Sequence, residues 1–148
     1  MTQDPLCLTL HASCVAWGGR GVLIRGRSGG GKSALALQMM AYGADLVADD
    51  QVMLWRETQG VMARAPSALS GLIEARHLGI LTAQPLEEVA LCAIVDLDQL
   101  ETDRLPKRRF ETLLEQEVQI FHRVDGPYFA AALMQFLRSG ALDPDARP

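Results

Sequence analysis

The most informative stretch of this sequence is Gly26-Arg27-Ser28-Gly29-Gly30-Gly31-Lys32-Ser33. It matches the phosphate-binding pattern G-x-x-x-x-G-K-[ST] at every fixed position. Residues 22–24 before it form an apolar run that suits a buried strand, and residues 34–40 after it are good helix formers. Phosphate binding requires this order of strand, turn and helix, because glycines let successive backbone N–H groups curl around phosphate oxygens and the helix start adds its unpaired amides.

The motif predicts a role for each of its parts. The backbone of residues 26–33 would hold the phosphates of a nucleotide, and the Lys32 ammonium would reach the β- and γ-phosphates. The Ser33 hydroxyl would bind Mg²⁺. The sequence therefore predicts a Walker A motif, or P-loop, that binds a nucleotide together with Mg²⁺.

Composition indicates one ordinary globular domain. The chain has 148 residues, of which 49% are hydrophobic and 22% charged, and a net charge of −4 that gives no reason to expect a nucleic-acid partner. No apolar run approaches the roughly 18 residues of a membrane span, and Asp4 and Pro5 interrupt the N-terminal segment, so we expect neither a membrane anchor nor a secretory signal. Cys7, Cys14 and Cys92 are odd in number and form no C-x-x-C pair, which suits the reduced thiols of a cytoplasmic protein.

In the first half of the chain we expect short strands around the loop. Residues 6–24 predict two strands joined by a glycine turn, the second of which enters the loop, and Gly43 is well placed to end the helix that follows. Residues 45–65 predict a meander of short strands. For residues 66–81 the pattern favours a helical turn or two that ends at Gly79.

The second half predicts a central strand, a loop, a further strand and a helix. Residues 89–96 are nearly all apolar, as expected of a strand covered on both faces. Residues 98–109 are charged and should form a solvated, mobile loop. A strand is expected at residues 118–121 and an amphipathic helix at residues 128–138, followed by a flexible tail over residues 139–148.

Three aspartates compete for the acidic roles in such a site. Asp49 and Asp50 follow an apolar strand, where adjacent residues would point to opposite faces unless the strand ends there. If it does end there, one carboxylate could touch Mg²⁺ or its water shell while the other accepts a proton from an attacking hydroxyl. Asp96 also follows an apolar strand, in the position of the metal-side acid of many nucleotide hydrolases. The residues alone leave this choice open.

Further polar residues could serve the same site. His11 lies in the first extended stretch, although a lone histidine is more often a packed or surface residue. Glu74 and Arg76 interrupt an apolar stretch and could supply a Mg²⁺ ligand and a phosphate clamp, or form an exposed pair. A basic loop could neutralise transition-state charge, or could be a solvated charge run. Its members are Arg104, Lys107, Arg108 and Arg109.

Taken together, three stretches resemble the catalytic domain of HPr kinase/phosphorylase, a bacterial enzyme that phosphorylates a serine of the phosphocarrier protein HPr. They are residues 21–33, residues 46–50 and residues 73–80, the last being similar to the family's L-E-I-R-G-L-G-I signature. The resemblance implies an α/β fold like that of phosphoenolpyruvate carboxykinase, with a P-loop in a mixed sheet and flanking helices. It also implies a cytoplasmic, usually hexameric enzyme, with residues 1–138 as the catalytic domain. The family's preceding N-terminal domain is not present here, which suggests the truncated form of some proteobacteria.

The resemblance assigns catalytic roles by position. His11 matches the catalytic histidine and Lys32 the phosphate-loop lysine. Asp50 matches the general base that takes the proton from the HPr serine, and Asp49 matches its neighbour near the metal. The resemblance therefore favours these two acids and leaves Asp96 a structural residue.

The remaining matches concern the metal and a mobile loop. Ser33 and Glu74 match the Mg²⁺ ligands, and Arg104 is the match for the mobile-loop arginine. Two departures stand out: His77 replaces the glycine of the signature, and residues 124–129 replace a V-R-P-G-R-N segment linked to phosphate-driven dephosphorylation, without either of its arginines. We therefore expect kinase activity more than phosphorylase activity.

The resulting hypothesis is transfer of the γ-phosphoryl group of ATP, with Mg²⁺, to a serine of HPr. One alternative is a small-molecule kinase or a plain ATPase built on the same loop. Another, from a different class, is a nucleotide-sensing module that binds ATP and controls a partner without chemistry.

Overall fold

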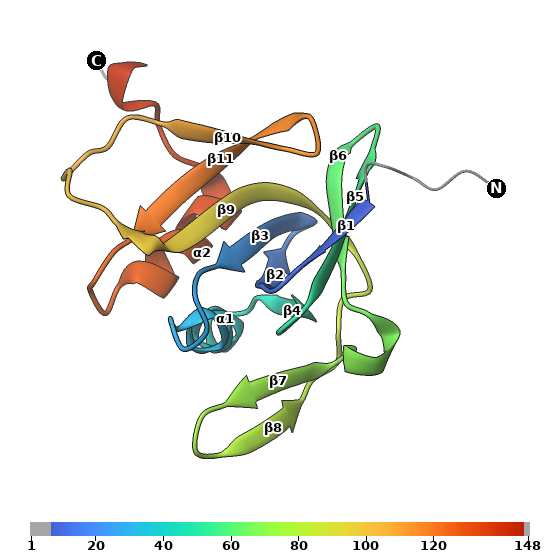
Figure 1. Cartoon of the computed structure of the whole chain (residues 1–148). Helices are drawn as coiled ribbons and strands as arrows, with labels where there is room; N and C mark the ends of the chain where they lie inside the picture. The colour runs from blue at the N-terminus through green and yellow to red at the C-terminus, as the bar shows by residue number, and fades with distance from the viewer. Residues whose placement is uncertain (1–6, 147–148) are drawn as a thin grey trace.

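The computed structural model describes residues 7–146 as a curled sheet with helices packed on one face (Figure 1). Within these residues the sheet has nine strands, with the main order β1-β5-β6-β9-β3-β2-β4, and β11 pairs with both β9 and β10. The strands are β1 (Cys7–Leu10), β2 (Ser13–Trp17), β3 (Arg20–Arg25), β4 (Asp45–Ala48), β5 (Val52–Glu57), β6 (Gly60–Arg64), β9 (Val89–Leu100), β10 (Arg109–Leu113) and β11 (Gln116–Arg123). Strand β9 is parallel to β3 and β11 and antiparallel to β6, so the sheet is mixed, as expected.

The centre of the sheet is apolar on both faces. Val22, Leu23 and Ile24 of β3 are all inaccessible to solvent, as are Ile94 and Val95 of β9 beside them. One face packs on the helices, and the other is closed by β5, β6 and β11 as the sheet curls on itself. The two apolar runs therefore form the paired central strands that the sequence predicts.

A tight hairpin leads the chain into the glycine-rich loop. Strands β2 and β3 pair antiparallel through the turn at residues 18–19, and helix α1 (Lys32–Ala41) starts after the loop. The helix ends in a Schellman motif, in which Ala44 N–H donates to the Met39 carbonyl and Gly43 N–H donates to the Met40 carbonyl. Gly43 adopts φ 110°, the left-handed region that its position predicts.

Helix α2 (Phe129–Ser139) packs beside α1 on the same face of the sheet. Its buried side chains are Ala130, Leu133, Met134 and Leu137, whereas Phe129 and Phe136 are only partly buried. The amphipathic pattern predicts Phe129, Leu133, Phe136 and Leu137 as the inner face; Leu133 and Leu137 are buried as predicted, and Ala130 and Met134 take the places of the two phenylalanines. Arg20 of β3 also anchors the helix end, since its guanidinium donates to the Leu137 carbonyl at 2.7 Å.

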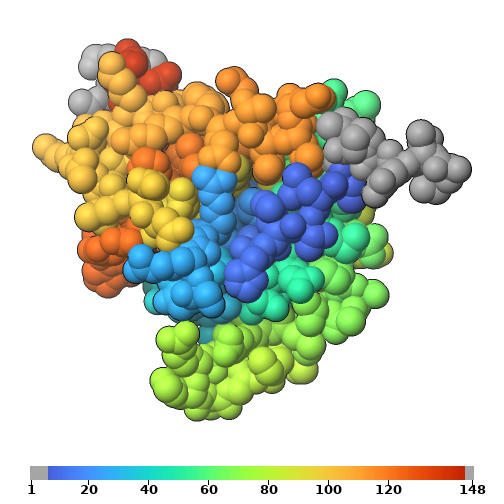
Figure 2. All heavy atoms as spheres, in the orientation of Figure 1, coloured from blue at the N-terminus to red at the C-terminus, as the bar shows by residue number. Residues whose placement is uncertain are grey.

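The helical turn expected to end at Gly79 is not found there: within residues 66–81 the helical part is a three-residue 3-10 helix near the start, and the rest is a pair of strands. After a short turn, η1 (Ser67–Leu69), strands β7 (Leu72–Ala75) and β8 (Gly79–Thr82) form a separate antiparallel hairpin. Ile73 is 1% exposed and joins the core between the sheet and α1, while Leu78 and Ile80 are exposed. Figure 2 shows this hairpin as a lobe beside α1. The apolar residues of this hairpin are therefore divided between the core, which Ile73 joins, and the surface, where Leu78 and Ile80 lie.

The charged segment after the central strand is also more regular than expected. Strand β9 continues to Leu100, and β10 follows, which leaves residues 101–108 as the loop.

Near the C-terminus, η2 (Pro144–Ala146) follows α2, and Arg108 donates to the Ala141 carbonyl at 2.8 Å. The extended stretch expected from residue 6 and the tail expected up to residue 148 each reach outside the described part of the chain. No helix in residues 7–146 is long and apolar enough to cross a membrane.

The tip of the β7–β8 hairpin carries backbone strain at the signature position. His77 adopts φ 71°, a conformation that costs a residue with a Cβ about 1–2 kcal/mol. We expect His77→Gly to stabilise the fold by about 1 kcal/mol, which corresponds to a rise in Tm of about 3 °C for a domain of this size. Thermal unfolding followed by circular dichroism measures this change. His77→Ala, which removes the imidazole but keeps Cβ, is the control and should give no gain; an equal gain from both variants would contradict the strain argument.

Candidate active site

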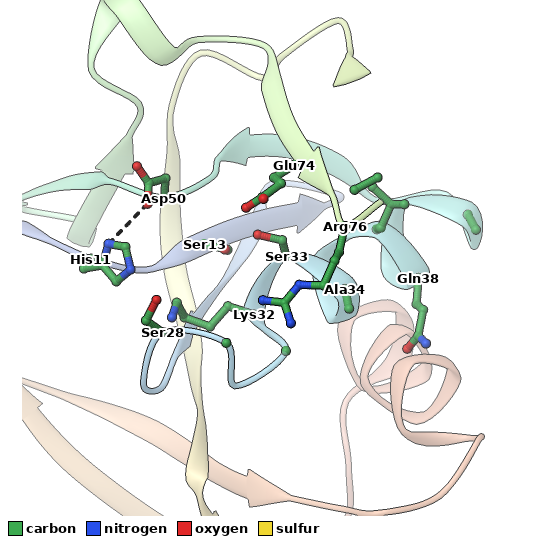
Figure 3. A pocket seen from close by; sticks show the side chains of 15 residues that line it. His11, Ser13, Ser28, Lys32, Ser33, Ala34, Gln38, Asp50, Glu74 and Arg76 are labelled. Atoms are coloured by element: carbon green, nitrogen blue, oxygen red, sulfur yellow. Dashed lines mark ion pairs between the residues drawn. The ribbon is translucent and has the colours of Figure 1, made fainter. Parts of the chain in front are cut away.

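A cavity of about 680 Å³ lies where the glycine-rich loop, α1, the end of β4 and the β7–β8 hairpin meet (Figure 3). Most of the predicted site residues line it. They are His11, Ser28, Gly29, Gly31, Lys32, Ser33, Asp50 and Glu74. Of the remaining loop residues, Gly26 and Arg27 line a smaller neighbouring cavity of about 310 Å³, which shares His11 with the first, and Gly30 lines neither.

The conformation of the loop depends on its glycines. A Cβ atom at Gly30 would lie 2.8 Å from the Arg27 carbonyl oxygen, closer than such atoms approach. Gly30 N–H donates to that same carbonyl at 2.9 Å, which makes the tight turn at the loop's centre. Gly31, the N-cap of α1, has φ 100°, so the helix starts from a conformation that favours glycine. The loop therefore presents backbone rather than side chains at the helix N-terminus.

The Lys32 side chain folds back over the glycine-rich loop, and its ammonium binds the loop backbone. The residue is 7% exposed, and its Nζ donates to the carbonyls of Gly26 at 2.8 Å and Arg27 at 3.0 Å. An ammonium has three donors, so these two bonds hold the side chain and leave one donor for a ligand. Lys32 thus places a positive charge at the wall of the cavity.

Asp49 lies behind the cavity and joins three elements. Its carboxylate is 5% exposed; Oδ1 accepts hydrogen bonds from Ser13 Oγ at 2.7 Å and Ser33 Oγ at 2.8 Å, and Oδ2 accepts one from the Glu74 N–H at 3.1 Å. These bonds tie β2, α1 and β7 to the end of β4. The Ser33 hydroxyl donates its hydrogen to Asp49, so toward the cavity it can offer only oxygen lone pairs. Lone pairs are what a cation binds.

Asp50 faces the cavity although Asp49 precedes it directly. Strand β4 ends at Ala48, and Asp50 adopts φ 73°, which breaks the strand alternation that would send the two carboxylates to opposite faces. Asp50 Oδ1 lies 3.3 Å from His11 Nδ1, and both side chains are more than half exposed (Figure 3). One aspartate is therefore buried and hydrogen-bonded, and the other is an exposed carboxylate with an imidazole beside it.

The β7 strand supplies the opposite wall. Glu74 of β7 and Arg76, the first residue after that strand, both line the cavity, as does Ala75 between them. Arg76 reaches toward the glycine-rich loop, since its Nη2 would lie 3.8 Å from a Cβ placed on Gly29. In Figure 3 the Glu74 carboxylate lies toward Ser33, and the Arg76 side chain extends toward the glycine-rich loop.

The residues of the basic loop and Asp96 lie away from this cavity. Arg104 is exposed on the loop between β9 and β10 and does not line it. At the base of that loop Arg109 pairs with Glu101, and the hydrogen bond from Arg109 holds the pKa of Glu101 below its usual value. Asp96 lines the smaller cavity and pairs with Arg25 at 3.4 Å, whose guanidinium also binds Glu111. Asp96 therefore has an ion-pair partner outside the main cavity.

Sequence reasoning missed Ser13, which is fully buried and donates to Asp49. The available signal was a hydroxyl in an otherwise apolar strand, because a buried hydroxyl needs a hydrogen-bond partner. It also missed Leu37, Gln38 and Ala41 of α1, which line the cavity beyond the loop. The sequence pattern of these residues predicted a helix but did not indicate which side of the helix faces a cavity.

Comparison with known proteins identifies the family. The family model described as HPr Serine kinase C-terminal domain matches residues 6–111. This chain belongs to the HPr serine kinase C-terminal domain family. All the candidate residues of the cavity lie inside the matched segment of the domain, as does Arg104.

Curated relatives of the HPr serine kinase domain are named HPr kinase/phosphorylase. The Bordetella pertussis protein is 47% identical over 74 residues, which cover 49% of this chain and 24% of that protein. The Halalkalibacterium halodurans protein is 39% identical over 108 residues, covering 65% of this chain and 35% of that protein. The chain thus spans about a quarter to a third of the length of these relatives.

A solved structure supports the same fold for this domain. The HPr(Ser) kinase/phosphatase from Coxiella burnetii matches with a TM-score of 0.76 at 23% sequence identity, over 88% of this chain and 94% of that chain. The curled mixed sheet with its helices is therefore the fold of a known HPr(Ser) kinase/phosphatase structure.

The buried Asp49 generates a stability prediction. We expect Asp49→Ala to lower the free energy of unfolding by about 3 kcal/mol, because hydrogen bonds to a buried charged group are lost and the Ser13 hydroxyl is left without its acceptor. Urea denaturation measures this change, and Asp45→Ala, at the exposed start of the same strand, is the matched control.

A double-mutant cycle with Ser13→Ala then isolates the Ser13–Asp49 bond. The expected coupling energy is about 1–2 kcal/mol. Additive effects of the two substitutions would show that the bond does not hold β2 to β4.

Proposed function

We propose that this domain transfers the γ-phosphoryl group of ATP to a serine of a protein acceptor, and that the acceptor is HPr, the protein named in its relatives. The observation that carries the proposal is the cavity lined by a glycine-rich loop, Lys32, Ser33 and the His11–Asp50 pair. A phosphoryl-transfer enzyme needs these functions together: amides and a cation for the phosphates, an oxygen for the metal, and a base for the acceptor.

The donor half of the site is the P-loop. Backbone N–H groups of residues 26–33 and the N-terminus of α1 would hold the phosphates, and the Lys32 ammonium would pair with the β- and γ-phosphate oxygens. Arg76, on the opposite wall, would add a second positive charge where negative charge grows in the transition state.

Ser33 and Glu74 suit a magnesium ion. The Ser33 oxygen is oriented by Asp49, and the Glu74 carboxylate lies in the same cavity. No group of three or more His, Cys, Asp and Glu within residues 7–146 forms a metal cage. Mg²⁺ usually takes only one or two protein oxygens together with substrate phosphates and water, so this sparse ligand set fits it. When bound, the ion neutralises charge on the phosphates.

The acceptor half of the site is the His11–Asp50 pair. The Asp50 carboxylate would accept the proton of the serine hydroxyl as the serine oxygen bonds to the γ-phosphorus, and the bond from that phosphorus to the bridging oxygen breaks to release ADP. His11, 3.3 Å from Asp50, would orient this carboxylate. Movement of the loop between β9 and β10 would bring Arg104 to the cavity, where its guanidinium would stabilise the charge that develops on the transferred phosphoryl group. From the family resemblance we also propose that the protein is cytoplasmic and assembles as a hexamer.

Replacing the proposed base tests the function. With [γ-³²P]ATP, Mg²⁺ and HPr, we expect Asp50→Asn to reduce serine phosphorylation by about 10²–10⁴-fold while ATP still binds. Asparagine tolerates the left-handed conformation at this position, so the backbone is kept. Phosphopeptide mapping locates the label, and Asp45→Asn on the exposed start of β4 is the matched control.

The same assay separates the alternatives. Full activity of Asp50→Asn would contradict the proposed base. Binding of ATP by the wild-type chain without transfer to HPr would instead favour a nucleotide sensor, or a kinase with a small-molecule acceptor. Run in reverse with phosphorylated HPr and inorganic phosphate, the reaction should be the slower one, because residues 124–129 lack the family's two arginines.

A further inference from the structure

Ser13 places a hydroxyl where the sheet is otherwise apolar. It begins β2 and is followed by Cys14, Val15 and Ala16, and all four residues are inaccessible to solvent. A buried hydroxyl costs free energy unless it has a hydrogen-bond partner, and here the Asp49 carboxylate is that partner at 2.7 Å. Ser13 also lines the cavity (Figure 3), so its hydroxyl belongs to the site as well as to the core.

The Ser13 hydroxyl shares one acceptor atom with Ser33. Both donate to Asp49 Oδ1, Ser13 from β2 at 2.7 Å and Ser33 from α1 at 2.8 Å, while Oδ2 accepts the Glu74 N–H at 3.1 Å. The terminal torsion of an aspartate has broad minima, so hydrogen bonds set the plane of its carboxylate. A carboxylate oxygen has two lone-pair sites, and Ser13 occupies one of them. Ser33 is thereby confined to the other.

The orientation of Asp49 determines what Ser33 presents to the cavity. A hydroxyl rotates about its C–O bond to follow its acceptor. While Ser33 donates to Asp49, its lone pairs face the cavity; if the carboxylate turned away, the Ser33 hydrogen could point into the cavity, where it would repel a cation. The Glu74 N–H bonds to the same carboxylate, so both proposed metal ligands are oriented through Asp49.

The base half of the site is held by other contacts of the same segment. Ala12 N–H donates to the Asp50 carbonyl at 3.2 Å, and His11 Nδ1 lies 3.3 Å from the Asp50 carboxylate. Neither contact uses the Ser13 hydroxyl. Loss of this hydroxyl should therefore affect the metal half of the site and leave the base half in place.

We propose that Ser13 is a positioning residue for the metal half of the site, an inference that rests on the proposed function. It acts through Asp49: by holding the carboxylate toward Ser33, it keeps the Ser33 oxygen oriented for a divalent cation that is bound with the nucleotide. In this role Ser13 touches neither the nucleotide nor the cation. Phosphate binding by the glycine-rich loop should not depend on it, because the loop and Lys32 are held by bonds of their own.

Isothermal titration calorimetry with a non-hydrolysable ATP analogue separates these two effects. The affinity is measured with Mg²⁺ and then with EDTA in its place, and the ratio of the two affinities reports the contribution of the metal. We expect Ser13→Ala to lower this ratio by about fivefold to tenfold, the effect of one hydrogen bond, and to leave the metal-free affinity unchanged. The Mg²⁺ concentration for half-maximal transfer to HPr should rise by a similar factor, whereas the pH profile of transfer, which reports the base, should not shift.

Two variants are the matched controls. Ser13→Thr keeps the hydroxyl and should retain the wild-type ratio. Val15→Ala, at a buried apolar position of the same strand outside the cavity, should destabilise the fold in urea without changing the ratio. If Ser13→Ala does not fold, Ser13→Cys fills the same space with a weaker donor and should lower the ratio instead.

Three results would overturn the inference, because each would leave Ser13 a role in the fold alone. They are an unchanged ratio in Ser13→Ala, an equal loss of affinity with and without Mg²⁺, and the same fall of the ratio in Val15→Ala. If the wild-type chain binds the analogue under neither condition, the proposed function itself fails.

Discussion

The arrangement of this molecule depends on one buried carboxylate. Asp49 accepts hydrogen bonds from Ser13, Ser33 and the Glu74 backbone, and so joins a central hairpin, the helix after the loop, and the outer hairpin. Few other groups could do this, because a carboxylate offers several lone pairs in opposite directions. The same bonds fix the Ser33 hydroxyl with its lone pairs free. Stability and the geometry of the candidate metal site therefore rest on a single side chain.

A second constraint makes the neighbouring residue useful. Strand β4 ends one residue before Asp49, and the left-handed backbone at Asp50 turns its carboxylate toward His11 and the cavity. Two adjacent acids thus take different roles because one is buried and saturated with hydrogen bonds while the other is exposed. The site lies at the carboxyl end of β3, where open α/β sheets commonly bind ligands.

Local chemistry allowed much of this to be predicted from sequence. The strand–loop–helix order around residues 26–33, the buried strand at residues 22–24 and the helix end at Gly43 each depend on near neighbours in the chain, and each was confirmed. Phosphate binding by the loop stays a prediction. The β7–β8 hairpin was missed because its turn places His77, a residue that disfavours left-handed backbone, at φ 71°. Ser13 and the α1 face depend on contacts across the fold. Nothing in the residues around Arg104 could predict that this side chain lies away from the cavity.

The proposed function requires a nucleotide in this cavity with its γ-phosphate toward Asp50. The most direct measurement is a crystal structure of the chain with Mg²⁺ and a non-hydrolysable ATP analogue. We expect the γ-phosphorus between the Lys32 ammonium and the Asp50 carboxylate, with the metal on the Ser33 oxygen. A triphosphate bound outside residues 26–33, or bound in the reverse direction with its nucleoside beside His11, would contradict it.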